Sequence, residues 1–567
     1  MRATGEKLTS IRKDDILPRR EIERLIAGGK HIIIFEGKVL RVDAWLKFHP
    51  GGEKAIKHMV GRDATDEINA LHSPEARVRM DSFQIGRIEG QWLNFLPPLQ
   101  GGVFRSDDID ESTCSEVEDS SMSAQESSHP PSPLFEAANC RPTLRRRQSS
   151  LTSISSTTFI PTSVTLERST RPRPFFLDAR TQEEIALDVA KYPSLDLENQ
   201  NRVVEKYREL DQRLAAKGLY NCNYLAYLVE FSRYSVLFAL FLLFLRYGWY
   251  GTSGFFLGCV WHQLVFTAHD AGHMGITHHF HIDTVIGIIV ADFIGGLSLG
   301  WWKRNHNVHH IVTNSPEHDP DIEHMPFFAI SHRFFDNLRS TYYDRIMSYD
   351  AFARLLIRYQ HYLYYPILLL GRFNLYRLSW EYLFLGQAPR RGPAWWHRWF
   401  EIAGQFFFWT WFGYGVVYLS IPDWRNRFLF VMVSHMVTAP LHVQITLSHF
   451  AMSTADLGVK ESFPQKMLRT TMDVDCPPWL DFFHGGLQFQ AVHHLYPRIP
   501  RHNLRQAQTF VKEFCKEVGI PYAIFSFYDG NKEVIGRLGD IAKQARILAE
   551  CQKNVAGQGV LSDRCGQ

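Results

Sequence analysis

Three histidine clusters, each placed after an apolar stretch, constrain this chain more than any other feature. They are His269-Asp270-Ala271-Gly272-His273, His306-Asn307-Val308-His309-His310 and Gln490-Ala491-Val492-His493-His494. On a helix, residues three or four apart share one face, so the histidines of each cluster can converge on one point. Imidazole suits iron, copper, nickel and zinc, and the clusters therefore predict a transition-metal site beside membrane segments. One such pair alone would be weak evidence, whereas three in one chain are strong evidence.

Length and charge limit the class of protein. The chain has 567 residues, which is too long for a single ordinary core. Its formal net charge of +3 is close to balance and argues against a protein that binds nucleic-acid phosphates. The 8 cysteines include no CxxC pair, so we expect reduced thiols and no disulfide or zinc framework. The polar start lacks the apolar core of a secretory signal, which predicts a cytosolic N-terminus.

Residues 8–90 are predicted to form a small α+β domain. Short apolar strands are expected at residues 32–35 and 39–42, with a turn between them. The stretch Phe48-His49-Pro50-Gly51-Gly52-Glu53 follows, and a helical stretch then leads to Ala70-Leu71-His72. This order resembles a cytochrome b5 domain, a family in which the HPGG histidine is an axial ligand of a b-type haem.

By that resemblance, His49 and His72 are the two axial ligands of haem b. Two imidazole ligands leave no open position on the iron, so such a haem carries electrons and does not bind oxygen. His58 falls in the middle of the helical stretch, and we expect it at the surface.

The chain changes character at residues 101–173, where serines crowd together and an acidic run precedes Arg145-Arg146-Arg147. Such a segment cannot bury enough apolar surface to offset its ordering entropy, and this predicts a disordered linker. A plain tether is the simpler role. Phosphorylation at Ser149 or Ser150, beside the arginines, is the alternative.

The region from residue 181 to 530 is predicted to be an all-α, polytopic membrane domain, followed by a C-terminal tail at residues 531–567. A polar helix pair at 181–217 leads into it. Four transmembrane helices of about 20 residues are expected from apolar segments, with interfacial helices near two further segments. The four spans are residues 225–245, 252–268, 400–421 and 428–450, and the interfacial segments are residues 283–302 and 356–382.

Two hairpins with short outer loops would place both termini and the long middle loop on one side of the membrane. Because that loop is rich in lysine and arginine, this side is predicted to be cytosolic. The last span carries His435, His442 and His449 at a spacing of seven, which places them on one helix face. Ionisable residues within membrane segments are functional candidates. His449, nearest the cytosolic end, is the best metal ligand of the three, and His442 a weaker one in an outer position. A stripe of hydrogen bonds between helices is the alternative for His435.

Taken together, the haem domain and the histidine clusters resemble the membrane-bound desaturases of the b5-fused, front-end type. The third cluster begins with Gln490, where most other desaturases and the related hydroxylases have histidine. The resemblance implies two irons that activate O2 and remove two hydrogens from an unactivated methylene pair. The implied iron ligands are His269, His273, His306, His309, His310, His449, Gln490, His493 and His494, with no catalytic residue beyond them. His278 and His484 are interpreted as outer or substrate-facing positions.

The resemblance also implies partners and a location. Electrons would come from NADH through a separate cytochrome b5 reductase, because the chain has no dinucleotide-binding glycine pattern. The fused haem raises the effective concentration of the electron donor. The enzyme is expected in the endoplasmic reticulum membrane, with the haem domain and the histidine clusters on the cytosolic side.

The sequences that surround the clusters suggest the substrate. They are HDAGHMGITH, GWWKRNHNVHHIVTN and FQAVHHLYPRIPRHNL. These sequences are most similar to those of the fungal Δ8 sphingolipid desaturases. The resemblance implies that the enzyme introduces a trans double bond into the sphingoid base of a ceramide. A Δ5 or Δ6 acyl-lipid desaturase is the alternative. A lipid hydroxylase, disfavoured by Gln490, and a membrane-tethered haem carrier with idle clusters are weaker alternatives. Trp301, Trp302 and residues 314–319 are expected near the membrane interface, either as contacts to the ceramide head or as surface anchors and loop contacts.

Overall fold

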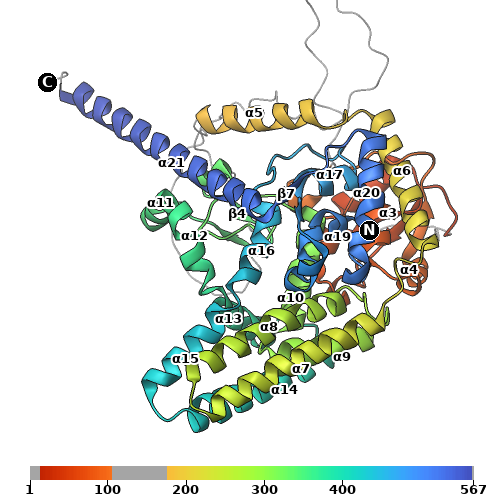
Figure 1. Ribbon diagram of the computed structural model, residues 1–567. Coiled ribbons are helices and arrows are strands. Elements are labelled where there is room, and N and C mark those ends of the chain that lie inside the picture. Colours follow the sequence, from red (N-terminus) through yellow and green to blue (C-terminus); the bar gives the residue numbers. More distant parts are fainter. Residues whose placement is uncertain (1–12, 105–174, 565–567) are drawn as a thin grey trace, which may run out of the picture. The chain divides into compact units, whose positions relative to one another are not determined.

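The computed structural model describes residues 13–104 and 175–564, which belong to one contact unit (Figure 1). Most of the predicted linker, including Ser149 and Ser150, lies outside the described residues.

The N-terminal domain is built on a three-stranded antiparallel sheet with the order β1-β2-β3. Strands β1 (Ile32–Phe35) and β2 (Lys38–Arg41) form the expected hairpin, in which Ile32 lies opposite Arg41. The two turn residues, Glu36 and Gly37, both have positive φ, as a tight hairpin turn requires. All four residues of β1 are buried. The remaining elements are α1 (Arg19–Ala27), α2 (Glu53–Lys57), α3 (Thr65–Leu71), α4 (Pro74–Met80) and β3 (Gln84–Arg87).

The expectation that His58 lies at the surface is wrong. His58 follows α2 directly and is fully buried. Its Nδ1 is 3.0 Å from the side-chain amide of Gln100, and its ring centroid is 5.2 Å from that of His318. Burial lowers the pKa of His58 well below its usual value. The sequence around His58 suggests an exposed helix, but in the fold Gln100 and His318, which are distant in sequence, cover this side chain.

A polar helix pair leads from the linker, as predicted: α5 (Phe175–Lys191) and α6 (Leu197–Ala216). Asp196 caps α6 by accepting a hydrogen bond from the backbone N–H of Asn199. Helix α6 packs against α20 (Leu504–Val518) and buries Tyr207 and Leu210 there.

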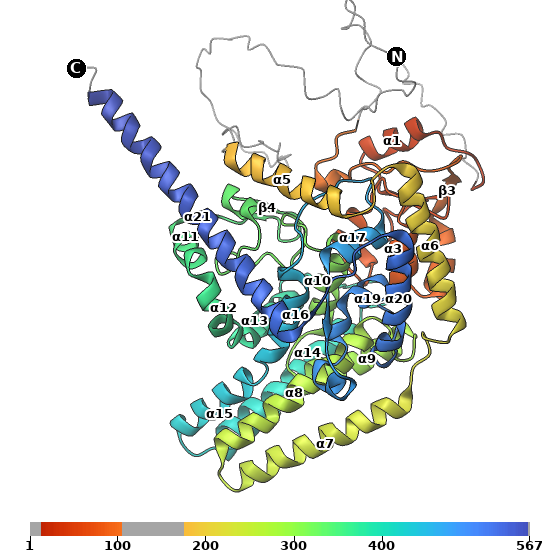
Figure 2. The same cartoon turned by 45° about the horizontal axis from the view of Figure 1, so that its top comes forward.

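Helices α7 (Tyr224–Arg246) and α8 (Tyr250–Gly272) form an antiparallel hairpin, and α8 also packs against α15 (Trp424–Met436) (Figure 2). Two stretches of the described residues are long and apolar enough to cross a membrane, Tyr224–Arg246 and Trp424–Phe450. A third candidate span would be added if the bent helix pair Phe280–Ile294 and Leu299–Val312 crossed the membrane as one unit. The expected number of four spans is therefore not confirmed. The second expected span falls in α8, which buries several polar side chains on its packed faces.

The second histidine cluster lies on α10 (Leu299–Val312), the second helix of this bent pair. Helix α9 (Phe280–Ile288) continues into a π-helical turn (Ile289–Ile294), and the chain then bends by 118° into α10 (Leu299–Val312). Gly296 has a φ of +69° at this bend. Ser298 caps α10 by accepting a hydrogen bond from the backbone N–H of Trp301.

The other expected apolar segments are divided into shorter pieces. The third expected span is split between α14 (His397–Phe408) and a π-helical segment (Trp409–Ser420), and residues 356–382 fall in three successive helices. These are α11 (Ala351–Arg358), α12 (Gln360–Leu368) and α13 (Gly371–Phe384).

The C-terminal part returns to the domain. It consists of α16 (Ala439–Phe450), α17 (Phe463–Thr470), β6 (Asp473–Asp475), α18 (Asp481–His484), α19 (Gln490–Leu495), α20, β7 (Ile524–Ser526) and α21 (Phe527–Arg564). Residues 531–564 of the predicted tail lie within α21. The first half of α21 buries Val534, Leu538 and Ile541 in the helical core, while its C-terminal half extends away from the other helices (Figure 1).

Candidate metal centre and haem pocket

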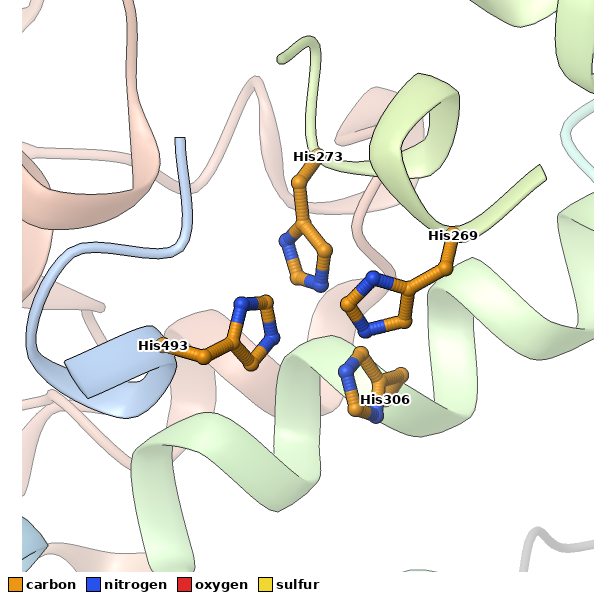
Figure 3. Close-up of side chains that lie close together, drawn as sticks. All are labelled: His269, His273, His306 and His493. Atoms are coloured by element: carbon orange, nitrogen blue, oxygen red, sulfur yellow. The ribbon is translucent and has the colours of Figure 1, made fainter. Parts of the chain in front are cut away.

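Four histidines from three helices point into a common space (Figure 3). His269 lies near the C-terminal end of α8 and His273 directly after it, while His306 comes from α10 and His493 from α19. One ring nitrogen of each lies within 4.8 Å of one from every other member. We call this set group A. It joins all three sequence clusters.

A second set, group B, lies beside it and contains His309 of α10, His449 of α16 and His494 of α19. Their nearest ring nitrogens also lie within 4.8 Å of one another. The ring centroid of His309 is 4.5 Å from that of His449 and 4.9 Å from that of His494. Helix α16 thus brings His449 close to histidines of the second and third clusters.

His310 lies between the two groups. Its Nε2 is 3.1 Å from Nε2 of His306 in group A, and its ring stacks on His494 of group B at 4.2 Å. Groups A and B are therefore adjacent parts of one buried, imidazole-lined centre.

The donor atoms of this centre suit a metal. Among the described residues, Nε2 of His269, His273, His493 and His494 is buried without a hydrogen-bond partner. An unsatisfied buried polar atom costs free energy, so these converging imidazoles suit a bound metal ion. Burial lowers the pKa of His493 and His494 well below its usual value, which keeps these rings neutral and able to bind metal.

Two aspartates after the second cluster hold its histidines in place. The carboxylate of Asp319 lies 2.9 and 3.0 Å from Nδ1 of His309, and Asp321 lies 3.7 Å from Nδ1 of His306. A carboxylate on one ring nitrogen fixes the tautomer and directs the other nitrogen toward a metal. An oxygen of Asp321 also lies within 4.8 Å of ligand atoms of His306 and His309, so this side chain is itself a possible ligand. Burial alone would raise the pKa of Asp321, but the neighbouring His309 and His306 hold it well below its usual value.

Of the two roles left open for residues 314–319, contacts within the protein are favoured for Asn314 and Asp319. Asn314 and Asp319 are almost completely buried. The backbone N–H of Asn314 donates to Asp319, and its side-chain amide donates to the carbonyl of His449. Because both bonds stay within the protein, this segment supports the metal centre.

Trp302 covers one side of group A. Its ring stacks on His306 at 4.6 Å and lies 5.2 Å from His269 and 5.5 Å from His273. A Cβ on Gly272 would sit 2.1 Å from this ring, so the glycine of the first cluster makes room for the tryptophan. This indole belongs to the metal centre, whereas Trp301 packs with Tyr382 in a separate apolar cluster.

A buried ion pair joins the first and third clusters. Asp270 pairs with Arg501, which follows the third cluster in the chain, and also accepts a hydrogen bond from Tyr227. Arg501 donates to the carbonyl of Phe266 at 2.9 Å as well. Sequence reasoning did not identify this pair; the acidic residue between two predicted metal-binding histidines was the available signal.

Several predicted residues lie outside groups A and B. The ring of His442 packs beside Gly371, and Nδ1 of His278 is 2.8 Å from the carbonyl of Met274. His484 is buried near Phe527, with ring centroids 5.8 Å apart. Gln490 begins α19 and is buried, one helical turn before His493 and His494.

His435 has partners of its own. Its Nδ1 is 2.8 Å from the carbonyl of Val431, and its Nε2 is 3.2 Å from the hydroxyl of Tyr376. These contacts favour the alternative of hydrogen bonding between helices. The helix breaks after Val437, so the expected single face of His435, His442 and His449 is interrupted.

The haem candidates meet in the N-terminal domain. The rings of His49 and His72 face each other with centroids 5.8 Å apart. Nδ1 of His49 is 2.9 Å from the carbonyl of Gly52, and Nδ1 of His72 is 3.2 Å from that of Ile68. Each carbonyl accepts a hydrogen bond from the Nδ1–H of its histidine, which leaves Nε2 free to bind iron. Burial lowers the pKa of both rings, that of His72 to about 3, so both are neutral donors.

Helix α10 connects the two sites. A Cβ on Gly51 would lie 2.6 Å from Nδ2 of Asn307, and one on Gly52 would lie 2.9 Å from Cγ of Arg304. The HPGG loop thus packs on α10, which carries His306 and His309 on another face. Since an α-helix with its side chains is about 10–12 Å across, roughly one helix diameter separates the loop from the metal centre.

Polar contacts far apart in sequence fix this arrangement. Nζ of Lys54 donates to the carbonyl of Thr341 and pairs with Asp344, both at 2.7 Å. Arg498, just after the third cluster, donates to the carbonyl of His72 at 3.1 Å.

Two family profiles match separate parts of the chain. The profile of a family described as "Fatty acid desaturase" matches residues 247–526, and one described as "Cytochrome b5-like Heme/Steroid binding domain" matches residues 19–89. The chain is 69% identical to the "Delta 8-(E)-sphingolipid desaturase" of Emericella nidulans over 98% of its own length and 100% of that protein. It is 50% identical to the protein of the same name from Kluyveromyces lactis, over 95% of each chain. A "Delta(8)-fatty-acid desaturase" of Helianthus annuus is 37% identical over 60% of this chain and 74% of its own.

Proposed function

This chain belongs to the cytochrome b5-fused members of the fatty acid desaturase family, and from that premise we propose that it introduces the Δ8 (E) double bond into the sphingoid base of ceramides. The observation that carries the proposal is a nearly full-length identity of 69% to a protein of that named activity. A buried centre of eight histidines beside a bis-histidine pocket supports it independently.

We assign the ligands of the two irons to groups A and B. His269, His273, His306 and His493 would hold one iron, and His309, His449 and His494 the other. His310 lies between the groups and can serve either iron. Gln490 shares a helix face with His494 and is assigned as a further ligand, directly or through water. When bound, the irons supply the activation of O2 and the removal of two hydrogens from a methylene pair.

The protein's own contribution is to position and shield this centre. Asp319 fixes the ring of His309, and the pair of Asp270 with Arg501 holds the first cluster against the third. Trp302 closes one side of group A. Neutral imidazoles leave the irons more positive than carboxylates would, which suits the oxidation of an unactivated methylene.

The haem between His49 and His72 would deliver electrons across α10. The fused domain contacts this helix directly, so no separate haem protein has to collide with the metal centre. We propose NADH and a separate cytochrome b5 reductase as the electron source and O2 as the oxidant. The proposed location is the endoplasmic reticulum membrane, with both iron sites on the cytosolic side.

Expression in a yeast that lacks Δ8-unsaturated bases tests this function. Mass spectrometry of long-chain bases and of acyl chains should reveal a new (E) double bond at carbon 8 of the base. A His309→Ala variant serves as the inactive control. Unsaturation confined to fatty acyl chains would contradict the ceramide assignment and favour an acyl-lipid desaturase.

A further inference from the structure

Two basic side chains of the helical domain lie beside the haem pocket. Lys303 of α10 lines a small cavity together with Pro50 of the HPGG loop. Burial lowers the pKa of His49, and the nearby charge of Lys303 lowers it as well. Arg498, which follows the third cluster, donates to the carbonyl of His72 at 3.1 Å. The helical domain therefore places one cation near each of the two histidines that face each other.

Both cations have a buried nitrogen that lacks an acceptor. Nζ of Lys303 and Nε of Arg498 have no hydrogen-bond partner among the residues that the structure describes. The carboxylate of Asp283, whose charge acts on Lys303, accepts instead from the backbone N–H groups of Thr277 and His278 at 2.9 and 3.2 Å. A buried cationic group without an acceptor costs free energy. Lys303 and Arg498 are thus suited to a ligand that brings carboxylate oxygens.

The haem domain's own contribution around the two histidines is apolar. Leu46 precedes His49, Ile68 and Leu71 precede His72, and all three side chains belong to one apolar cluster. A haem has one apolar edge and one edge with two ionised propionate carboxylates. Apolar side chains stabilise the first edge by burial, whereas buried carboxylates need cations beside them. The two domains therefore suit opposite edges of the haem.

The haem domain has a cation of its own near one of the histidines. Arg77 of α4 donates to the side chain of Asn69 at 2.6 Å, and its charge acts on His72. Its Nε is buried without a partner in the described part of the chain. Arg77 can therefore share a carboxylate with Arg498. The cation beside His49, in contrast, comes from the helical domain.

We propose that Lys303 and Arg498 bind the two propionate carboxylates of the haem, so that the helical domain completes the haem site of the fused domain. The inference rests on the proposed haem between His49 and His72. The haem then has its carboxylate edge toward the helical domain and its apolar edge within the haem domain.

Both cations belong to segments that carry proposed iron ligands. Lys303 precedes His306 by three residues on α10, a rise of about 4.5 Å along the helix axis. Arg498 follows His494 by four residues. A haem held by both cations is fixed relative to α10 and to the third cluster. Haem binding is thereby coupled to the docking of the haem domain on the helical domain.

The test measures the release of haem from purified full-length protein into an excess of apomyoglobin. Protein loaded with native haem is compared with protein loaded with the dimethyl ester of haem, which has no ionised propionates. Lys303→Met should release native haem about tenfold faster, as the loss of a hydrogen bond to a charged group predicts, and should not accelerate release of the ester. Lys303→Arg keeps the charge and should release native haem at the wild-type rate.

Arg498→Met separates the two contacts of that side chain. The lost bond to the carbonyl of His72 accelerates the release of both haems, whereas the lost propionate contact accelerates only the release of native haem. Native haem should therefore gain more than the ester. Arg213→Met removes an exposed cation of α6 that pairs with Glu513; it is the matched control and should change neither rate. The propionate bending mode in the resonance Raman spectrum of native haem is a second readout. It should shift in Lys303→Met and stay unchanged in Arg213→Met.

Two results would overturn the inference. The first is that Lys303→Met and Arg498→Met leave the propionate mode unchanged and either release both haems at the wild-type rate or accelerate both equally. The cations then do not bind the propionates, while the haem site and the proposed desaturase function stand. The second is a wild-type protein without a bis-imidazole haem spectrum, in which case the inference and the proposed haem site fail together.

Discussion

The molecule contains two histidine sites that are built in opposite ways. The haem pocket takes two histidines from one small domain, and local backbone carbonyls of Gly52 and Ile68 orient both rings. The metal centre takes its histidines from α8, α10, α16 and α19, and Asp319 and Asp321, in the segment after α10, orient two of them. The haem pocket therefore depends on local structure, whereas the metal centre depends on the packing of the whole helical domain. The two sites should fail independently when their ligands are changed.

The largest expected effect is at the metal centre. His309→Ala removes a member of group B and should reduce Δ8 product below detection, because the iron assigned to group B would lose both a ligand and the contact of that ligand with Asp319. The reduced-minus-oxidised haem spectrum should be unchanged. His361→Ala, outside both groups, is the control. Full activity in His309→Ala would refute the assignment of group B.

The haem ligands come next. His49→Ala or His72→Ala should abolish the b-type haem spectrum, since two imidazoles hold the iron. Product should fall by about tenfold or more, because a diffusing donor must then replace the tethered one. Non-haem iron, measured after removal of haem, should stay at its wild-type level. A normal haem spectrum in either variant would rule out the pocket.

A smaller effect is expected from a residue that only orients a ligand. Asp319→Asn keeps the size of the side chain but loses the charge that holds Nδ1 of His309. Metal affinity or activity should fall by about 10–100-fold, with the haem spectrum intact. Asp540→Asn, at an exposed position of α21 beside Lys543, is a suitable control. Wild-type iron content and activity in Asp319→Asn would show that the carboxylate is dispensable.

The smallest expected effect concerns the contact between the two sites. Lys54→Met removes the bonds from the haem domain to Thr341 and Asp344 but leaves both iron sites untouched. Because the linker still tethers the haem domain, single-turnover reoxidation of the haem by the loaded centre should slow only a few-fold. Lys57→Met, whose partner Glu53 lies in its own helix, controls for the lost charge. An effect as large as that of His309→Ala would mean that docking, and not the tether, governs electron delivery.

The same contrast explains what the sequence could predict. The HPGG turn and the spacing within each histidine cluster are local patterns, so the convergence of the cluster histidines could be expected from helix geometry. The role of Asp319 could not, because it depends on a turn that brings the carboxylate back onto α10. His435, His442 and His449 were expected on one helix face, but the break between α15 and α16 separates His435 from the other two. His442 packs beside Gly371 and belongs to neither histidine group.

Other differences arise from long-range packing. His58 is covered by segments near Gln100 and His318, which no local pattern could indicate. The pair of Asp270 and Arg501 joins residues far apart in the chain. The expected number of four spans is not confirmed, and α8, where one of them was expected, buries polar side chains against other helices. Pattern reasoning thus succeeds where one helix or turn sets the geometry.

The central claim, that one chain holds two separate histidine-built iron sites, is tested most directly by counting metal. Total iron and haem should be measured on the same purified full-length protein, in wild type and in His309→Ala. We expect iron well beyond one atom per haem in the wild type, and a loss of that excess in His309→Ala without loss of haem. One iron per haem in both proteins would contradict the claim.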